Sequence, residues 1–306
     1  EMAELTGLPE GIAVASGNID AHVVVAGANA VRPGQLTAIL GTSSCYVLNG
    51  EEYRDCPGVF GIVDGGAVDG YWGFECGQTA VGDIFAWFVD NCVPGSYVEE
   101  AKSRGVSVHD LLVEKSKGQE IGEHGLVALD WHNGNRSILA DARLSGLVVG
   151  QTLTTAPEDV YRALLEATAF GCRVIIDNFE EHGIKVDEIV AAGGLLKNSY
   201  YMQMLSDITR RPISVSTAEQ TGALGSAVFA AVAAGVYPDV FAAADAMSSV
   251  EKHAYEPNLE ASARYDEVYE IYKELHDFFG RYNGVSPMHR LKDIRARIYR
   301  DRDAEQ

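Results

Sequence analysis

Three short segments combine glycine with small polar or acidic residues, and each follows a run that predicts a strand. They are residues 17–22 (GNIDAH), 40–44 (LGTSS) and 192–198 (AGGLLKN). Open α/β folds bind their ligands at turns that follow the carboxyl ends of strands. The three turns are therefore the first candidates for a functional site.

The first turn holds a single carboxylate, that of Asp20. An aspartate in such a turn can act as a general base that takes a proton from a hydroxyl group. A lone aspartate is also common as a helix cap or as a solvated turn residue. Spacing does not decide between these roles, so both interpretations of Asp20 stay open on the sequence alone.

The other two turns could hold a phosphorylated or planar ligand. The hydroxyl and N–H groups of Gly41, Thr42 and Ser43 can contact phosphate oxygens without a lysine, although such turns are also common in plain hairpins. Gly193 and Gly194 allow a ligand to approach the backbone closely. A tight turn from strand to helix requires glycine for its own conformation about as often, so this segment also keeps two interpretations.

Several common catalytic motifs do not occur in the sequence. It has no GxxxxGKS or GxxxxGKT phosphate loop, no GxSxG nucleophile elbow, no HExxH pair and no HRD catalytic loop. The cysteines are scattered and never form a CxxC pair, which indicates reduced thiols rather than a disulfide framework or a zinc site. They are Cys45, Cys56, Cys76, Cys92 and Cys172.

Composition narrows the class of protein further. The chain has 306 residues, of which 47% are apolar, so it can bury a sizeable core. Its net charge of -20 argues against nucleic-acid binding, because phosphate backbones are usually met by basic surfaces. No run of about 18 apolar residues and no basic-then-apolar leader occurs, so we expect neither a membrane span nor a signal peptide, and the default location is the cytosol.

The elements that position the turns are predicted from apolar periodicity and from glycine and proline punctuation. The strongest helix begins at a capping box at residues 155–158 and continues to about residue 179. Strands are expected at 11–14, 36–40, 45–48, within 58–77, at 188–192 and at 213–216, and further helices at 21–30, 78–89, 199–209, 222–234 and 259–282. Residues 94–146 are weakly periodic and predict an insertion, and the charged end from residue 290 predicts an exposed helix or tail.

Taken together, the turns resemble the FGGY family of carbohydrate kinases. The segment with Asp20 resembles the catalytic aspartate segment near the junction of two domains, residues 40–44 resemble the phosphate-contacting hairpin, and residues 192–198 resemble the adenosine loop. Residues 219–227 (EQTGALGSA) resemble the helix start that follows this loop. The second family signature fits residues 146–166, although Gln151 stands where an aliphatic residue is usual.

This resemblance covers the chain to about residue 284 and implies the α/β actin-like ATPase fold, in which nucleotide lies between two ribonuclease-H-like domains. The chain is then expected to be the C-terminal domain of a two-domain sugar kinase. Residues 1–30 would be the end of the N-terminal domain or a hinge, residues 31–284 the nucleotide-binding domain with an insertion at 94–146, and residues 285–306 a charged helix or tail.

Residues 18–22 and 72–78 (WGFECGQ) are most similar to the members of the family that phosphorylate ribulose. The resemblance implies transfer of a phosphoryl group from ATP, with Mg²⁺, to a ketopentose: L-ribulose to L-ribulose 5-phosphate in L-arabinose catabolism. Asp20 would be the catalytic base and bind the sugar, and Glu75 would contact a sugar hydroxyl, unless it is a capping or ion-paired carboxylate. No metal ligand is assigned. Gly41, Thr42 and Ser43 would bind phosphate, and Gly193, Gly194 and Asn198 the nucleotide.

Two further expectations follow from the resemblance. A missing N-terminal domain of the same polypeptide would supply most sugar contacts, so this chain alone is expected to bind nucleotide weakly and to have little or no kinase activity. The alternatives are another FGGY kinase, for example one that acts on xylulose, a non-catalytic actin-like nucleotide-binding module, or a structural α/β domain. A homodimer is expected only as a base rate for soluble assemblies.

Overall fold

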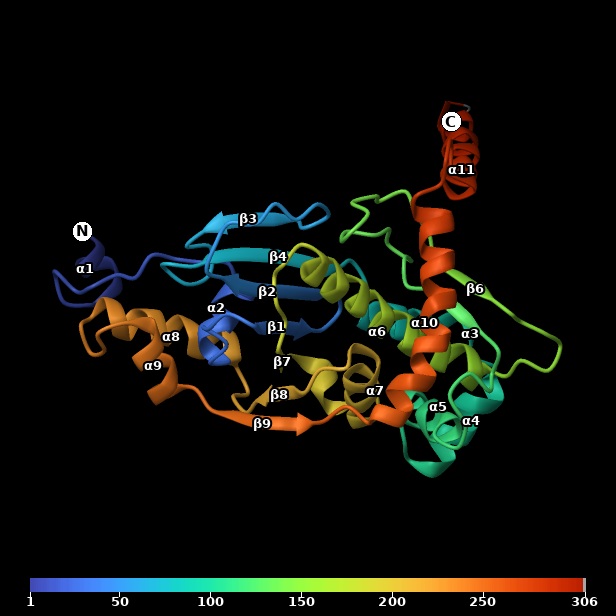
Figure 1. Ribbon diagram of the computed structural model, residues 1–306, viewed down its shortest axis with the longest axis horizontal. Helices are drawn as coiled ribbons and strands as arrows, with labels where there is room; N and C mark the ends of the chain where they lie inside the picture. The colour runs from blue at the N-terminus through green and yellow to red at the C-terminus, as the bar shows by residue number, and fades with distance from the viewer. Residues whose placement is uncertain (305–306) are drawn as a thin grey trace.

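A seven-stranded mixed sheet forms the centre of the computed structural model, which describes residues 1–304 (Figure 1). Its strand order is β3-β4-β2-β1-β7-β8-β9. The strands are β1 (Gln35–Leu40), β2 (Ser44–Gly50), β3 (Gly61–Asp64), β4 (Trp72–Gln78), β7 (Glu188–Ala192), β8 (Ile213–Ser216) and β9 (Val250–Tyr255). A small second sheet pairs β5 (Val127–Leu129) with β6 (Leu147–Val149).

The centre of the sheet joins an antiparallel half to a parallel half. The strands β1 and β2 form a hairpin, and β4 and β3 extend it in antiparallel fashion. On its other edge β1 pairs in parallel with β7, which pairs in parallel with β8. The strand β9 then closes this edge in antiparallel orientation.

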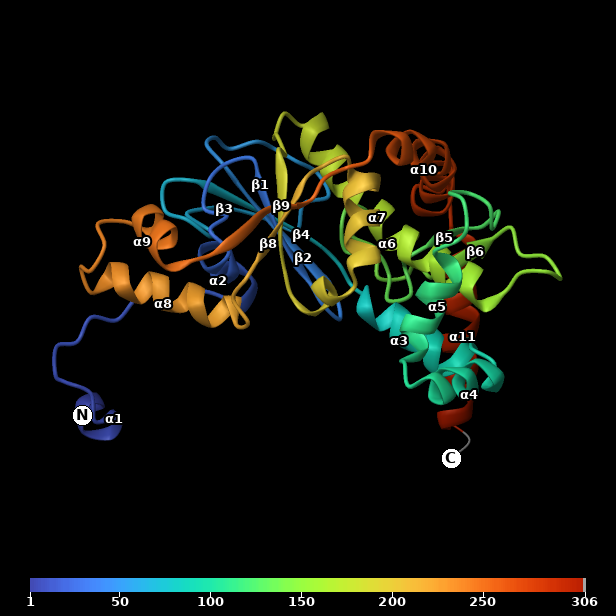
Figure 2. The same cartoon turned by 90° about the horizontal axis from the view of Figure 1, so that it is seen from below.

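Helices cover both faces of the sheet, as Figure 2 shows. One group is α2 (Asp20–Gly27), α8 (Thr221–Ala233) and α9 (Val240–Met247); the opposite group contains α6 (Pro157–Glu181) and α7 (Ser199–Thr209). The remaining elements are α1 (Met2–Thr6), α3 (Gly82–Cys92), α4 (Gly95–Arg104), α5 (Val108–Ser116), the short 3₁₀ helix η1 (Gly194–Lys197), α10 (Leu259–Gly280) and α11 (Pro287–Ala304).

The side chains of β1 alternate between these two layers, as a strand buried on both faces requires. Leu36, Ala38 and Leu40 join the large core cluster under α6, whereas Ile39 packs with the residues of α2. The helix α6 fills the large cluster because most of its residues are buried. The carboxylate of Asp159 accepts the N–H of Ala156 at 2.8 Å and so caps the start of α6.

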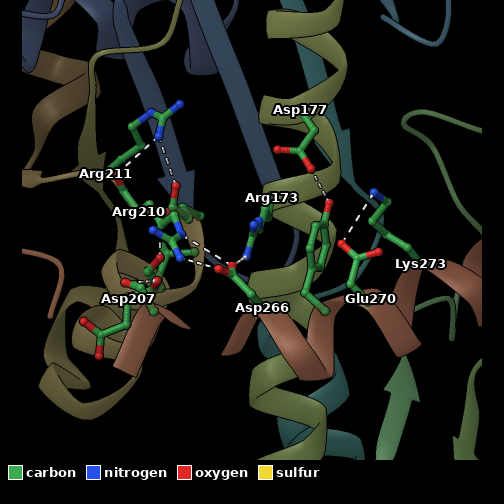
Figure 3. A network of polar contacts seen from close by, with 12 residues as sticks. Arg173, Asp177, Asp207, Arg210, Arg211, Asp266, Glu270 and Lys273 are labelled. Carbon is green, nitrogen blue, oxygen red and sulfur yellow. Dashed lines mark hydrogen bonds and ion pairs between the residues drawn. The ribbon is translucent and has the colours of Figure 1, made fainter. Parts of the chain in front are cut away.

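Two ion pairs and one hydrogen bond fasten α10 to the α6 and α7 layer (Figure 3). Asp266 of α10 accepts a hydrogen bond from Arg173 of α6 at 2.7 Å and also pairs with Arg210, which directly follows α7. The hydroxyl of Tyr269, one turn further along α10, donates to Asp177 of α6 at 2.6 Å. These contacts hold α10 across two elements that belong to different parts of the sequence.

The helices α2 and α8 cross at backbone contact, because each places a glycine at the crossing point. A Cβ atom added to Gly225 would lie 1.8 Å from the carbonyl oxygen of Val23, and one added to Gly27 would lie 2.0 Å from that of Thr221. Any larger residue would therefore push the helices apart. This crossing fixes α2, and with it Asp20 at the start of α2, against the rest of the domain.

Most elements predicted from periodicity are confirmed, but three expectations need correction and two elements were missed. Residues 11–14 form no strand: Val14 is 85% exposed and pairs with no other strand of the described chain. The predicted cap residue Thr155 instead accepts the N–H of Thr152, and Asp159 caps α6. The helix expected at 78–89 begins only at Gly82, because Gln78 ends β4. The strand β9 and the helix α9 were not predicted.

Residues 94–146, which predict an insertion, contain α4, α5 and β5 and add buried side chains to the large core cluster, among them Leu112, Leu129 and Trp131. All five cysteines are free thiols. Within the described part of the chain, no helix has the length and apolar character needed to cross a membrane. The charged end forms α11, whose Leu291 and Tyr299 are exposed.

The α2–α8 crossing leads to a stability prediction. We expect Gly225→Ala to lower the free energy of unfolding by about 3 kcal/mol, because the new methyl group meets a backbone oxygen that cannot move aside. Urea denaturation followed by circular dichroism measures this change.

Gly222→Ala is the matched control in the same helix, because its Cβ would meet only ordinary contacts at 3.8 Å or more. We expect it to stay within about 1 kcal/mol of the unmodified chain. Equal losses of stability for Gly222→Ala and Gly225→Ala would contradict the close crossing.

Candidate functional site

The hairpin turn and the glycine loop lie side by side because they follow neighbouring parallel strands. Ile39 of β1 is the register partner of Ala192 of β7, so both strands end at the same edge of the sheet. Gly193 has a φ of 111°, and a Cβ added there would lie 2.4 Å from the carbonyl oxygen of Leu40. Gly193 is therefore required by the contact between the two turns.

Gly194 has a different role, because a Cβ at this position would have no heavy atom within 4 Å. The space in front of it is open, so packing within the chain does not require a glycine here. Asn198 ends the same loop, and its side-chain oxygen accepts the N–H of Tyr201 at 3.1 Å, which caps α7. The backbone of Gly194 is thus the part of the loop that a ligand can approach closely.

The hairpin turn is tied to the start of α3 by backbone hydrogen bonds. The carbonyl oxygen of Thr42 accepts the N–H of Val81 at 2.8 Å, and the carbonyl oxygen of Gly41 accepts the N–H of Gly82 at 3.0 Å. The residues Thr42 and Ser43 are exposed. Their hydroxyl groups are held on a fixed backbone and are open to a ligand, as the phosphate interpretation requires.

A pocket of about 350 Å³ lies between α3, α5, α6 and η1, and it is lined by Gly82, which is bonded to Gly41 of this turn. This volume falls within the usual range of small-molecule sites, about 300 to 1,000 Å³. Its wall combines apolar side chains with polar and charged ones, so it can contact both the faces and the edges of a planar base. The lining residues are Gly82, Phe85, Ala86, His109, Asp110, Val113, Tyr161, Gly194, Leu195, Lys197 and Asn198.

Sequence reasoning missed most of the pocket wall. His109 comes from α5, in the segment predicted as an insertion, and its Nδ1 lies 2.8 Å from the hydroxyl of Tyr161 on α6. Burial lowers the pKa of His109, so this imidazole is neutral near pH 7. For Phe85 the helix predicted at residues 78–89 was an available signal, whereas no spacing rule joins His109 to the hairpin.

A larger pocket of about 590 Å³ lies against another part of α3 and includes Trp87, Phe88 and Leu147. None of the residues of the three turns lines it. We therefore assign the ligand site to the smaller pocket, because that pocket is continuous with Gly194 and Gly82 and so with the hairpin.

Asp20 is the first residue of α2 and is exposed. Its Oδ1 accepts the N–H of Ala21 at 2.8 Å, so it makes the local turn contact expected of a lone aspartate. Asn18 holds the preceding segment in place, since its amide donates to the carbonyl oxygen of Gly66 at 3.2 Å. The carboxylate is thus presented at the surface on an anchored segment.

Glu75 of β4 lies beside this segment and is an ion-paired carboxylate. Its side chain is 15% exposed. One oxygen pairs with Arg136, and the other lies 3.2 Å from Nε2 of His22 on α2. No pattern in the sequence indicated Arg136 as a partner. Glu75 was expected either to contact a sugar hydroxyl or to be a capping or ion-paired carboxylate, and the ion pair is present. The carboxylate remains partly exposed beside the Asp20 segment.

The structure thus forms two groups of candidate residues that meet at β2. The hairpin, the glycine loop and the pocket form one group, and the carboxylates of Asp20 and Glu75 form the other. Cys45, at the start of β2, joins them, because its sulfur lies 3.9 Å from Oε1 of Glu75. Burial raises the pKa of Cys45 to about 11, and the negative charges of Glu75 and Asp20 contribute to that rise.

Residues 36–234, more than half of the chain, match the sequence profile of the FGGY family of carbohydrate kinases, C-terminal domain. The chain belongs to that family.

Proteins named ribulokinase are similar to this FGGY chain along almost all of its length. The one from Mycolicibacterium smegmatis is 54% identical over 300 residues, which cover 98% of this chain and 53% of that protein. The one from Geobacillus thermodenitrificans is 50% identical over 286 residues, which cover 92% of this chain and 51% of that protein. The chain spans about half the length of the curated relatives it matches.

Solved structures of sugar kinases share its fold. A xylulose kinase from Rhodospirillum rubrum superposes with a TM-score of 0.79 at 23% identity, over 92% of this chain and 54% of that one. A gluconate kinase from Lactobacillus acidophilus gives a TM-score of 0.74 at 20% identity, over 86% and 51%. The predicted fold class is confirmed: this is the α/β C-terminal domain of an FGGY kinase, with the actin-like ATPase fold.

Because Gly193 and Gly194 have different surroundings, substitutions at these two positions test whether ATP binds in the pocket beside Gly194. We expect Gly194→Val to weaken binding of ATP by about tenfold or more, because the new side chain projects into open space where a ligand would lie. Isothermal titration calorimetry with a non-hydrolysable ATP analogue measures this affinity, and thermal unfolding should show no loss of stability.

Gly193→Ala is the matched comparison and should instead destabilise the fold, since its Cβ meets the carbonyl oxygen of Leu40 at a positive φ. Unchanged nucleotide affinity in Gly194→Val would remove the pocket from consideration.

Proposed function

We propose that the polypeptide to which this chain belongs transfers the γ-phosphoryl group of ATP to a ketopentose, L-ribulose, to give L-ribulose 5-phosphate in the breakdown of L-arabinose. The observation that carries this proposal is the 54% identity to a ribulokinase over 98% of the chain. The motifs add support, because the segments around Asp20 and Glu75 are those in which the sequence is most similar to ribulose-phosphorylating kinases. ATP is made and used in the cytoplasm, and we place the enzyme there.

In the proposed reaction Asp20 orients the terminal hydroxyl group of the sugar and accepts its proton as the oxygen attacks phosphorus in line. An exposed carboxylate on an anchored helix start suits this role, because the sugar can reach it while its backbone stays fixed. Glu75 would accept hydrogen bonds from other hydroxyl groups of the same sugar. Its oxygens have lone pairs left after the contacts with Arg136 and His22.

The hairpin and the pocket would bind the nucleotide, which enters as its complex with Mg²⁺. The adenosine would occupy the pocket beside Gly194, and the phosphates would extend toward Gly41, Thr42 and Ser43. This orientation of the nucleotide is supported by Gly82, which lines the pocket and whose N–H is bonded to the carbonyl oxygen of Gly41 in the turn. Phosphoryl transfer depends mainly on positioning and electrostatics, and the turn supplies both through fixed N–H and hydroxyl donors.

The proposal needs the other half of the polypeptide. This chain covers 53% of the length of the ribulokinase from Mycolicibacterium smegmatis. We propose that an N-terminal domain supplies most of the sugar contacts and further phosphate contacts across the cleft. The chain alone would then bind nucleotide weakly and turn over little or no sugar.

A coupled ADP-release assay tests the proposal on the full-length polypeptide, with this chain alone in parallel. The sugars are L-ribulose, D-ribulose, D-xylulose, L-xylulose and glycerol. We expect turnover with L-ribulose by the full-length protein and none by the isolated chain. Higher kcat/KM for xylulose than for ribulose would assign the protein to a different branch of the family.

We also expect Asp20→Asn to lower kcat by about 10²-fold or more, the usual contribution of a general base. Stability should not change, because Asp20 is exposed. Glu251→Gln, which removes an exposed carboxylate on β9, is the control and should keep full activity. Full activity of Asp20→Asn would show that this carboxylate is only a turn residue.

A further inference from the structure

Arg136 comes from a short loop for which no sequence motif predicts a chemical role. The loop is closed on itself, because Asn135 and Asp141 exchange two backbone hydrogen bonds of 2.9 and 2.8 Å. The side-chain oxygen of Asn135 also accepts the N–H of Leu139 at 3.0 Å inside the loop. Arg136 therefore projects from a constrained backbone rather than from a free connection.

Two side-chain hydrogen bonds fasten this loop to the end of β4. The hydroxyl of Thr79 donates to the carbonyl oxygen of Gly134 at 2.8 Å, immediately before the closed loop. The hydroxyl of Ser137, which is buried, accepts the N–H of Gly77 at 3.1 Å. Arg136 thus lies between two anchored residues, Gly134 and Ser137, which are held by Thr79 just after β4 and by Gly77 within it.

The guanidinium of Arg136 is held in place by two contacts, and the absence of a side chain at Gly77 leaves room for it. It donates to Oε1 of Glu75, and its Cζ lies 4.1 Å from the centre of the Phe60 ring. Gly77 leaves room for it, since a Cβ at Gly77 would lie 3.3 Å from Nη1 of Arg136. Stacking on one face and pairing at one edge fix both the position and the plane of the guanidinium.

The second oxygen of Glu75 is held from the opposite side. Nε2 of His22 lies 3.2 Å from Oε2, and His22 stands two residues after Asp20 on α2. The carboxylate is therefore tied to the loop through one oxygen and to the helix of the catalytic aspartate through the other. A carboxylate has about four lone-pair sites, so it can still accept hydrogen bonds from a ligand in this fixed orientation.

We propose that Arg136 is a positioning residue: it holds the carboxylate of Glu75 in the orientation that receives the hydroxyl groups of the sugar, and it acts through Glu75 alone. This rests on the proposed function, because it assumes that Glu75 contacts the sugar. The ion pair is partly exposed, and such pairs contribute little to stability, so its main effect is on the geometry of the site.

The test is a double-mutant cycle in the full-length polypeptide, with L-ribulose and ATP as substrates. We expect Arg136→Gln to raise KM for the sugar by on the order of tenfold, because the Glu75 carboxylate loses its fixed orientation, and to leave KM for ATP unchanged. Arg136→Lys, which keeps the charge without the planar fork, should restore part of the loss. In a Glu75→Gln background, Arg136→Gln should cause no further rise in KM for the sugar.

Arg143→Gln is the matched control. Arg143 follows the same loop but pairs with Asp293 and the carbonyl oxygen of His289 at the surface, so both KM values should stay unchanged. Thermal unfolding of every variant checks that the fold is intact. Calorimetric titration with L-ribulose gives the same cycle from binding alone if turnover is too slow.

The possible outcomes separate this proposal from the proposed function. Additive losses in the double variant, or a rise of both KM values in Arg136→Gln, would overturn the positioning role and leave the kinase assignment intact. An unchanged sugar KM in Glu75→Gln would overturn both the sugar contact of Glu75 and the role of Arg136, while turnover that depends on Asp20 would remain. Absence of both turnover and binding with every sugar would overturn the proposed function itself.

Discussion

The parallel pairing of β1 with β7 is the constraint on which the candidate site depends. Two segments about 150 residues apart end at the same edge of the sheet only because these strands lie next to each other in the same direction. The turn after β1 then meets the loop after β7 at van der Waals distance, and Gly193 is the residue that makes this approach possible. Without this pairing, the hairpin and the glycine loop would be two unrelated turns.

The second constraint is the glycine crossing of α2 and α8, which sets where the carboxylates lie. Gly27 and Gly225 let the helix backbones touch, so α2 cannot shift along the sheet without breaking that contact. His22 then reaches Glu75 from α2 while Arg136 reaches it from the opposite side. Helix packing therefore places the Asp20 segment beside Glu75, and strand pairing places the hairpin turn beside the glycine loop.

What the sequence predicted well was local, and what it missed was either weakly patterned or long-range. The strands at 188–192 and 213–216 and the helix at 199–209 have clear periods and glycine boundaries, and the structure confirms them. The strand β9 alternates weakly and is largely exposed, so its pattern carries little signal. Residues 11–14 have the apolar pattern of a strand, but a strand also needs a partner strand to pair with, and the local pattern does not tell whether one lies beside it. The partners Arg136 and His109 lie 61 and 52 residues from Glu75 and Tyr161, and no spacing rule reaches that far.

The two parts of the site are made rigid in different ways, and the difference follows from what each part would bind. Phosphate oxygens are contacted by backbone N–H groups, so the hairpin is held by backbone bonds between Thr42 and Val81 and between Gly41 and Gly82. In the proposed function, sugar hydroxyl groups would be bound by a side-chain carboxylate, which can rotate unless other side chains hold it. Glu75 accordingly has a charged partner on one oxygen and an imidazole on the other. The domain thus holds the backbone of the hairpin turn rigid, where backbone N–H groups would bind phosphate. It holds the rotamer of Glu75 rigid, where this side chain would bind the sugar.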